Sequence, residues 1–172
     1  KPLFDSHHNF EINNNHVFVG YNLRFHPLIK FIKKKTAGKN LWNIQVFCGS
    51  YLPDWRTGRD YSQTSSSKKE TCGGVLLDLS HELDYVQYLT GAINLEHVKN
   101  EKVSNLNIET DDLLLLSGTS ENGAHVHITL NYFTREPIRQ IIIDGENISI
   151  QADLITNSIQ LFEGNEQSEF TL

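Results

Sequence analysis

The sequence predicts an α+β fold: an open, mainly antiparallel sheet with helices on one of its faces. Several short segments between residues 112 and 162 have the character of strands and are separated by turn signals. Within residues 124–133, apolar and polar side chains alternate. Ala124, Val126, Ile128, Leu130 and Tyr132 would face one way, and His125, His127, Thr129 and Asn131 the other. One face of the sheet therefore packs against helices, and the other is polar.

The first third of the chain predicts a strand, a helix and a second strand. Residues 16–20 (HVFVG) are β-prone. Pro27 suits the first turn of a helix that runs to the basic residues 33–35, and cations favour a helix C-terminus. Residues 41–51 contain the alternation of a half-buried strand. Residues 54–69 are rich in Ser, Thr, Gly and charge, which predicts a long functional or mobile loop.

The helix pattern of residues 73–91 is the best defined in the chain. Glycines stand at both ends of this segment. Between them the apolar residues recur at steps of three and four: Leu76, Leu79, Leu83, Val86 and Leu89. Five strands follow, at residues 112–119, 124–133, 139–144, 148–152 and 158–162. Turn signals at Asn122-Gly123 and at residues 144–147 join neighbours, so the strands form an antiparallel meander.

Composition limits the classes of partner. The chain has 172 residues, 38% of them hydrophobic, and a net charge of −6. This charge argues against nucleic acids and anionic membranes, which require a basic surface. The apolar runs are too short to span a bilayer and no leader opens the chain, so a soluble protein is expected. Two cysteines are too few for a disulfide scaffold and fit the reducing cytoplasm, where the protein is expected to lie. Cys48 and Cys72 are expected to be free thiols. Because Lys1 is not a start residue, the chain is expected to begin upstream.

Asp78 and His81 are the first candidate for chemistry. They are three residues apart on the predicted helix and therefore share a face. A histidine held by a carboxylate can act as a general acid or base at a hydroxyl or carbonyl group. The alternative is a structural polar contact or a charge near the helix N-terminus.

The loop at residues 51–61 is the second candidate. It holds two Arg, two Asp, one Trp and two Tyr within eleven residues. Aromatic rings and bidentate Arg donors suit a polyhydroxylated ligand that carries a phosphate or a carboxylate. The alternative is a loop in which the Arg and Asp side chains pair with each other.

Two further signals are weak or missing. His125 and His127 are spaced to share one face of a strand, but no third ligand is identifiable, so no metal site is predicted. The chain contains neither G-x-G-x-x-G nor G-x-x-x-x-G-K-[ST], and therefore lacks a loop that could bind the phosphates of a dinucleotide.

Several segments, in the same order along the chain, resemble the Gfo/Idh/MocA oxidoreductases. They are Lys1-Pro2-Leu3, residues 19–27 (VGYNLRFHP), the loop at 51–61, the helix with His81-Glu82-Leu83-Asp84, and the segments at 108–112 and 135–145. The resemblance implies a Rossmann domain followed by a domain with an open, largely antiparallel sheet that holds substrate and mediates oligomerisation. By this resemblance residues 1–38 would be the end of a truncated Rossmann domain, with its last strand and helix. Residues 39–172 would form the substrate-binding and oligomerisation domain.

The resemblance also implies roles for individual residues. Lys1 would contact both substrate and nicotinamide, and His81 would transfer the proton. Asp78 would assist His81, although the family's aspartate lies four residues before the histidine, where this chain has Leu77. The implied substrate contacts are Tyr21, Asn22, Arg24, Arg56, Arg59 and Tyr61.

The function implied by the resemblance is that of an NAD- or NADP-dependent oxidoreductase. Its substrate would be a sugar or nucleotide-sugar of polysaccharide biosynthesis, and the chain alone would be inactive. The alternative is a non-catalytic sugar-binding or oligomerisation module that forms a homo-oligomer through the polar sheet face. Metal-assisted hydrolysis at the two neighbouring histidines is a third, weaker hypothesis.

Overall fold

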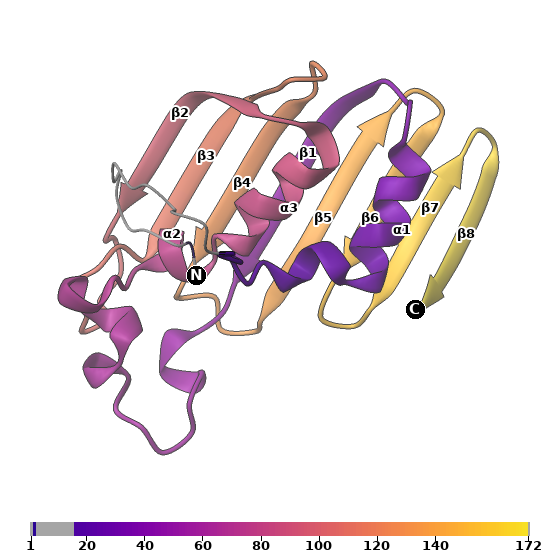
Figure 1. Ribbon diagram of the computed structural model, residues 1–172. Helices are drawn as coiled ribbons and strands as arrows, with labels where there is room; N and C mark the ends of the chain where they lie inside the picture. The colour runs from indigo at the N-terminus through magenta and orange to yellow at the C-terminus, as the bar shows by residue number, and fades with distance from the viewer. Residues whose placement is uncertain (1, 3–15, 172) are drawn as a thin grey trace.

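The computed structural model describes Pro2 and residues 16–171. In this part of the chain, eight strands form one open sheet in the order β2-β3-β4-β1-β5-β6-β7-β8 (Figure 1). The strands are β1 Leu41–Gly49, β2 Ile93–Glu101, β3 Leu113–Ser120, β4 His125–Asn131, β5 Ile138–Gly145, β6 Ile148–Asp153, β7 Ser158–Glu163 and β8 Glu166–Thr171. The α-helices are α1 Pro27–Thr36, α2 Val75–Asp78 and α3 His81–Thr90. Short 3-10 helices include η1 Asn22–Phe25 and those at Leu52–Asp54, Tyr61–Gln63, Ser65–Ser67 and Lys69–Thr71.

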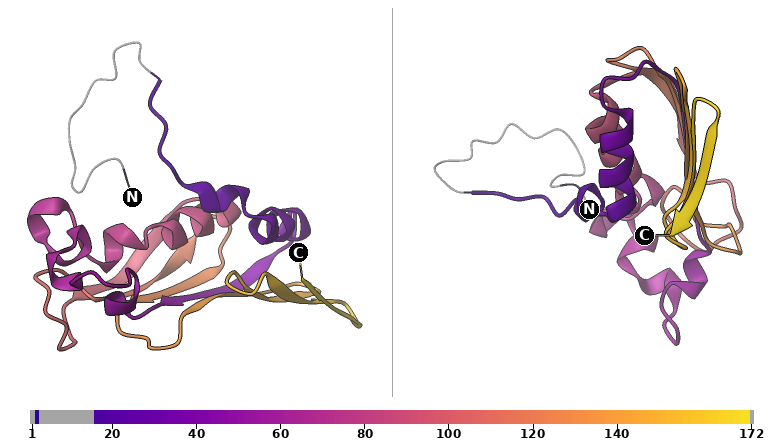
Figure 2. Two further views of the ribbon diagram at one scale, coloured as in Figure 1. Left: turned by 90° about the horizontal axis from the view of Figure 1, so that it is seen from below. Right: turned by 90° about the vertical axis from the view of Figure 1, so that its right-hand side faces the viewer.

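The helices lie on one face of the sheet, and the other face is open (Figure 2). The core lies between the two layers. Leu28, Ile29 and Ile32 of α1 are fully buried, as are Val126 and Leu130 of β4. Burial alternates along the strands because successive side chains point to opposite faces. The predicted α+β class, with helices on one face of a mainly antiparallel sheet, is confirmed.

The sheet is antiparallel at every pairing except one. β1 lies between β4 and β5, parallel to the former and antiparallel to the latter. The predicted meander is therefore correct for β5 to β7 and for β3 with β4, but wrong between β4 and β5, which β1 separates. Nothing in the alternation of β1 indicates its neighbours, because period-two patterns define faces rather than partners.

Three further elements differ from the prediction. Residues 16–20 form no strand; they lie outside the helices and strands of the described chain and are exposed. The carbonyl groups of Val19 and Gly20 accept local hydrogen bonds from the backbone N–H groups of Tyr21 and Asn22, so they are used in a turn and not in a strand ladder. β2 and β8 were not predicted, because almost all of their residues are exposed on both sides and show no apolar alternation.

The helical pattern of residues 73–91 is interrupted. α2 ends at Asp78 and α3 begins at His81, because Leu79 leaves the helical conformation with φ −104° and ψ 23°. The flanking glycines have positive φ, 115° at Gly74 and 83° at Gly91. These angles suit residues without a Cβ and fix where the two helices begin and end.

One residue of the polar face is also buried. Asn131 was expected on the open face, but it is 3% exposed. Its Oδ1 accepts hydrogen bonds from the backbone N–H groups of Phe133 and Thr134 and from the Thr134 hydroxyl. The side chain thus accepts hydrogen bonds from backbone N–H groups just after the end of β4, and buried N–H groups need such an acceptor.

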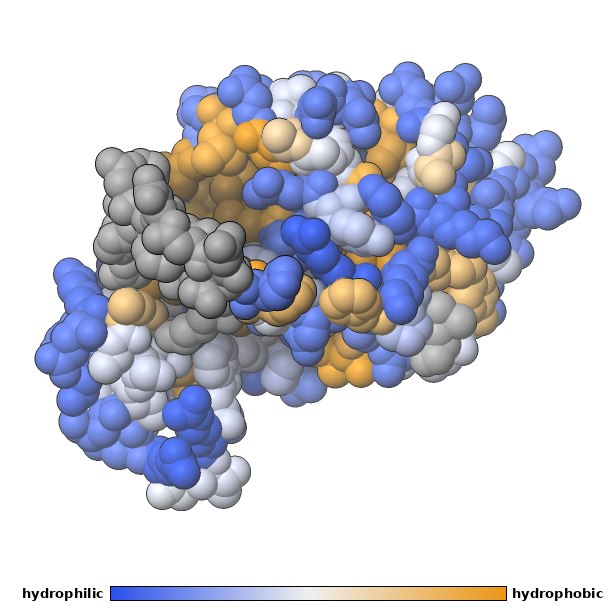
Figure 3. Space-filling view, viewed as in Figure 1, coloured by the Kyte–Doolittle hydropathy of each residue, from blue (hydrophilic) through white to orange (hydrophobic). Residues whose placement is uncertain are grey.

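An apolar area remains on the helix-bearing face. Figure 3 shows it over β2 and β3, at the upper left, beyond the reach of α3. Leu95 and Val98 of β2 contribute to this area, and both are about half exposed, at 54% and 53%. They pair with Gly118 and with the buried Leu116, which places them on the side of the helices.

Candidate active site

A cleft of about 310 Å³ lies between η1, α2 and α3. It is lined by Pro2, Tyr21, Arg24, Leu76, Leu77, Ser80, Leu83, Asp84 and Gln87. Segments far apart in the sequence therefore meet here, as the turn after residue 20 lies against the first turns of the predicted acid/base helix. Lys1, which the resemblance implies for this site, lies outside the described residues.

Two polar contacts join η1 to α3. Arg24 donates from Nε and Nη2 to the two carboxylate oxygens of Asp84, at 2.8 and 2.6 Å. This hydrogen-bonded pair raises the pKa of Arg24. The Tyr21 hydroxyl lies 3.4 Å from Ser80 Oγ, to which it donates. Tyr21 and Arg24 therefore order the wall of the cleft, and Asn22 between them is exposed. Bidentate pairs of this kind fix orientation as well as charge.

His81 is the first residue of α3 and lies beside the cleft. Its ring meets the ring of Tyr21 edge-on, with 5.4 Å between centroids. Its Nδ1 is buried and has no hydrogen-bond partner. Burial lowers the pKa of His81 from its ordinary value of 6.5. The imidazole is therefore neutral at pH 7 and can accept a proton.

Asp78 does not pair directly with His81 in the described structure. Its Oδ2 instead accepts a hydrogen bond of 2.7 Å from the hydroxyl of Tyr132, at the end of β4. The interruption of the helix after Asp78 removes the i, i+3 relation that an uninterrupted helix would give the two side chains. The role of Asp78 in proton transfer stays a prediction.

The loop at residues 51–61 forms a separate, shallow recess. Arg56, Arg59 and Tyr61 line it, and both arginines are exposed. Asp60 accepts hydrogen bonds from the backbone and side chain of Ser62. No ion pair within the described chain joins these arginines to the loop's aspartates, so the internally paired alternative has no support there. The Tyr61 hydroxyl accepts from the backbone N–H of Asn107.

A partly buried ion pair lies beneath α3. Arg139 Nε of β5 donates to Glu82 Oε1 at 2.6 Å, and the Glu82 side chain is fully buried. Burial raises the pKa of the nearby Cys48 thiol to about 12, so it stays protonated. Cys48 and Cys72 are not joined by a disulfide. The pair connects the helix that begins with His81 to the middle of the sheet.

Sequence reasoning missed three residues near His81: Tyr132, Glu82 and Arg139. Tyr132 was correctly assigned to the buried face but given no polar role. The charges of Glu82 and Arg139 were visible, but the two residues lie 57 positions apart, and Tyr132 lies 54 positions from its partner Asp78. Only a charged residue within an otherwise apolar helix could have signalled the ion pair.

The described residues offer neither a cluster of metal ligands nor a membrane-spanning helix. They contain no group of three or more His, Cys, Asp or Glu side chains arranged to hold a metal ion. His125 and His127 are exposed on the open face. Among the helices of this same part of the chain, none is long and apolar enough to cross a membrane.

The fold and the cleft define a two-layer α+β domain with a histidine at the start of a helix on one face of an open sheet. The sequence profile of the GFO/IDH/MocA C-terminal domain matches residues 30–151. The chain therefore belongs to the Gfo/Idh/MocA oxidoreductase family, and the resemblance is confirmed. A search of curated proteins finds no match.

Solved structures support the same fold. UDP-N-acetylglucosamine 3-dehydrogenase GnnA from Acidithiobacillus ferrooxidans matches with a TM-score of 0.68 and 19% identity, over 89% of this chain and 45% of that one. The WlbA dehydrogenase from Bordetella pertussis, in complex with NADH and UDP-GlcNAcA, matches with a TM-score of 0.70 and 20% identity, over 87% of this chain and 44% of that one. An oxidoreductase from Agrobacterium radiobacter, in complex with NAD⁺, L-tartaric acid and magnesium, matches with a TM-score of 0.71 and 18% identity, over 88% of this chain and 44% of that one. The chain thus spans less than half the length of these proteins.

Proposed function

We propose that this chain is the C-terminal part of an NAD(P)-dependent oxidoreductase that acts on a hydroxyl or carbonyl group of a sugar or nucleotide-sugar. The observation that carries the proposal is a neutral histidine beside a cleft, with one ring nitrogen buried. Two of the similar structures support the substrate class, since one is a UDP-N-acetylglucosamine dehydrogenase and another holds NADH with a UDP-sugar. The low cysteine content, two in 172 residues, supports a cytoplasmic location.

The residues of this chain do not fit a whole dinucleotide. No glycine-rich phosphate loop is present in the sequence. The only cation among the described residues that line the cleft is Arg24, whose guanidinium is bound to Asp84. We therefore assign the cofactor to the rest of a full-length protein. We also propose that residues 1–38 end its cofactor domain and that residues 39–172 bind substrate, with Arg56, Arg59 and Tyr61 as contacts.

His81 supplies the acid/base step in this proposal. Oxidation of a hydroxyl group removes a proton from oxygen and a hydride from the same carbon. The neutral imidazole accepts the proton, and in the reverse direction the imidazolium returns it to the carbonyl oxygen. Tyr21 packs against the ring and limits the orientations it can adopt.

Calorimetric titration of NAD(H) and NADP(H) tests the assignment of the cofactor. The 172-residue chain and the protein of the complete reading frame are compared. Binding by the longer protein alone, followed by turnover of sugars or nucleotide-sugars, would support the proposal. The absence of binding by either protein would overturn it and favour the non-catalytic module.

The pH profile follows from the pKa of His81. Burial lowers this pKa below 6.5, and oxidation requires the unprotonated ring. In the full-length enzyme, kcat/KM for oxidation should therefore rise with pH, and the midpoint of the rise should lie below the ordinary histidine pKa of 6.5. Steady-state rates between about pH 5 and pH 8 bracket that value and measure the curve. A rising limb centred above neutrality would contradict this role for His81.

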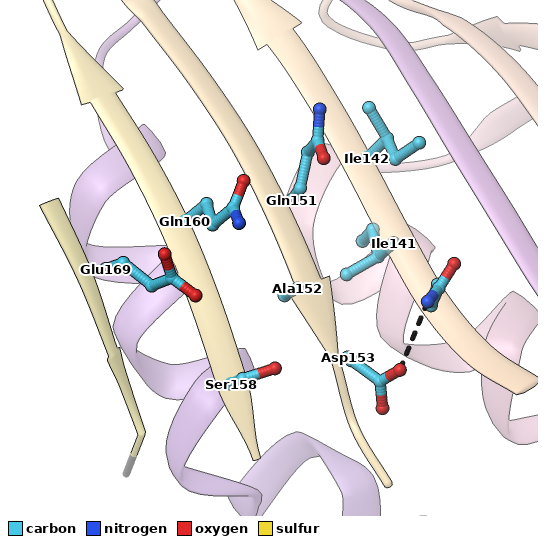
Figure 4. A pocket seen from close by; sticks show the side chains of 9 residues that line it. Ile141, Ile142, Gln151, Ala152, Asp153, Ser158, Gln160 and Glu169 are labelled. Carbon is cyan, nitrogen blue, oxygen red and sulfur yellow. Dashed lines mark hydrogen bonds between the residues drawn. The ribbon is translucent and has the colours of Figure 1, made fainter. Parts of the chain in front are cut away.

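We further propose that the open face of the sheet pairs with a second copy. In Figure 4 polar side chains from neighbouring strands line a recess on the β5–β8 part of this face. Gln151 pairs with Gln160, which pairs with Glu169, so a polar row crosses three strands beside Ile142. A polar face of this kind suits an interface with trapped water.

Replacing Ile142 with arginine places a charge in the middle of this face, opposite Gln45 and Gln151. In an isologous interface both subunits contribute the same surface, so the new arginine occurs twice in the dimer. The dimer dissociation constant should therefore increase at least roughly tenfold. Light scattering over a dilution series measures the constant. Glu166→Arg, at the exposed start of β8, is the control. A monomeric wild-type protein, or equal association of both variants, would exclude this face.

A further inference from the structure

Tyr132 connects the sheet to the interruption between α2 and α3. It follows the last residue of β4, its side chain is fully buried, and its hydroxyl donates to Asp78 Oδ2 at 2.7 Å. Asp78 is the last residue of α2, and His81 is the first of α3. A hydrogen bond to a carboxylate is stronger than one between neutral groups. The contact therefore holds the chain at the point where its direction changes, three residues before His81.

The tyrosine itself is held from several sides. Its backbone N–H donates to Asp112 O at 3.1 Å, and its carbonyl accepts from Leu52 N–H at 2.9 Å. Its ring meets that of Trp55 edge-on, with centroids 5.2 Å apart. Trp55 Nε1 donates to Ser50 Oγ at 2.7 Å. The position of the hydroxyl is therefore set by the end of β4 and by the start of the loop at residues 51–61.

The hydroxyl also keeps its proton. Burial and the neighbouring Asp78 raise the pKa of Tyr132 far above its ordinary value of 10. The Tyr132 hydroxyl thus remains a hydrogen-bond donor over the pH range in which His81 titrates. A fixed donor of this kind suits positioning rather than proton transfer.

We propose that Tyr132 is a positioning residue: by holding the Asp78 carboxylate, it fixes the junction of α2 and α3 and so orients His81 beside the cleft. The inference rests on the proposed function for its kinetic consequence, but not for its structural one. Trp55 extends the same set of contacts to the loop that carries Arg56 and Arg59, so that the loop and the acid/base residue share one support.

Tyr132→Phe in the full-length enzyme is the kinetic test. This variant keeps the ring on Trp55 and removes only the hydroxyl. Since small displacements of a reacting group cost up to about a hundredfold, kcat should fall about 10- to 100-fold with substrate KM almost unchanged. In an Asp78→Ala background, Tyr132→Phe should have no further effect on kcat. Tyr85→Phe is the matched control, because Tyr85 is also fully buried but its hydroxyl has no hydrogen-bond partner.

Hydrogen exchange of the same proteins is the structural test. The amide of Leu79, which donates to Val75 O, and that of Glu82, which donates to Leu79 O, should exchange at least roughly tenfold faster in Tyr132→Phe. The amide of Lys30 in α1, bonded to His26 O, should not change. Equal exchange at all three sites in the variant and the wild type would overturn the proposal.

The outcomes separate this inference from the proposed function. If the wild type turns over substrate, His81→Ala does not, and Tyr132→Phe retains full kcat, then only the positioning role fails. If the wild type shows no turnover, the proposed function fails, and hydrogen exchange alone decides whether Tyr132 holds the junction.

Discussion

Replacement of His81 by alanine is expected to lower kcat of the full-length enzyme by roughly 10²- to 10⁴-fold, the usual contribution of a general acid or base. The neutral ring beside the cleft is the proton acceptor, and alanine leaves none in its place. Cofactor affinity should remain unchanged, because this chain contributes no phosphate-binding loop. Nicotinamide absorbance measures turnover, and calorimetry measures binding.

The matched control is His125→Ala, which removes an exposed histidine from the open face of the sheet. It should leave kcat within a factor of two of the wild type, roughly the precision of such comparisons of barrier height. If His81→Ala also kept most of its activity, the acid/base group would have to be another residue. The assignment of the cleft as the active site would then lose its main support.

Arg139→Met is expected to give the largest loss of stability among the variants considered. The change leaves the Glu82 carboxylate fully buried and without its cation, and breaking such a pair costs about 3–5 kcal/mol. Urea denaturation followed by fluorescence measures the free energy of unfolding and its slope. The loss should appear as a lower midpoint with an almost unchanged slope.

The double variant Glu82→Met with Arg139→Met provides the control. It removes both charges and keeps side chains of similar length, so most of the lost stability should return. Two observations would contradict the interpretation: a single variant as stable as the wild type, or a double variant less stable than the single one. Either would mean that the pair contributes little and that packing dominates at this position.

The parts of the fold that could be predicted are those with one buried face. In β4, Val126, Ile128 and Leu130 alternate with polar residues because one side packs on helices, and this alternation is visible in the sequence. β2 and β8 lie at the sheet edges and are exposed on both sides, so burial leaves no period in their residues. The place of β1 depends on pairing register, which no local pattern records.

The candidate site was predictable only in part. His81 was found because an ionisable residue in an apolar helix is unusual. Its relation to Asp78 was assumed from uninterrupted helical spacing, whereas the backbone leaves that geometry at Leu79. The contacts that order the region, from Tyr132 to Asp78 and from Arg139 to Glu82, join segments distant in sequence. Such contacts depend on the finished fold.

The central place of β1 has a consequence for how the chain folds. Its partners in β4 and β5 lie at residues 125–145, whereas β5 to β8 pair with their immediate neighbours in sequence. During synthesis β1 must therefore wait, unpaired, until residues far behind it have left the ribosome, while local hairpins can already close. Contacts of long sequence separation slow folding. We therefore expect the pairing of β1 with β4 and β5 to form later in folding than the hairpins between strands adjacent in sequence.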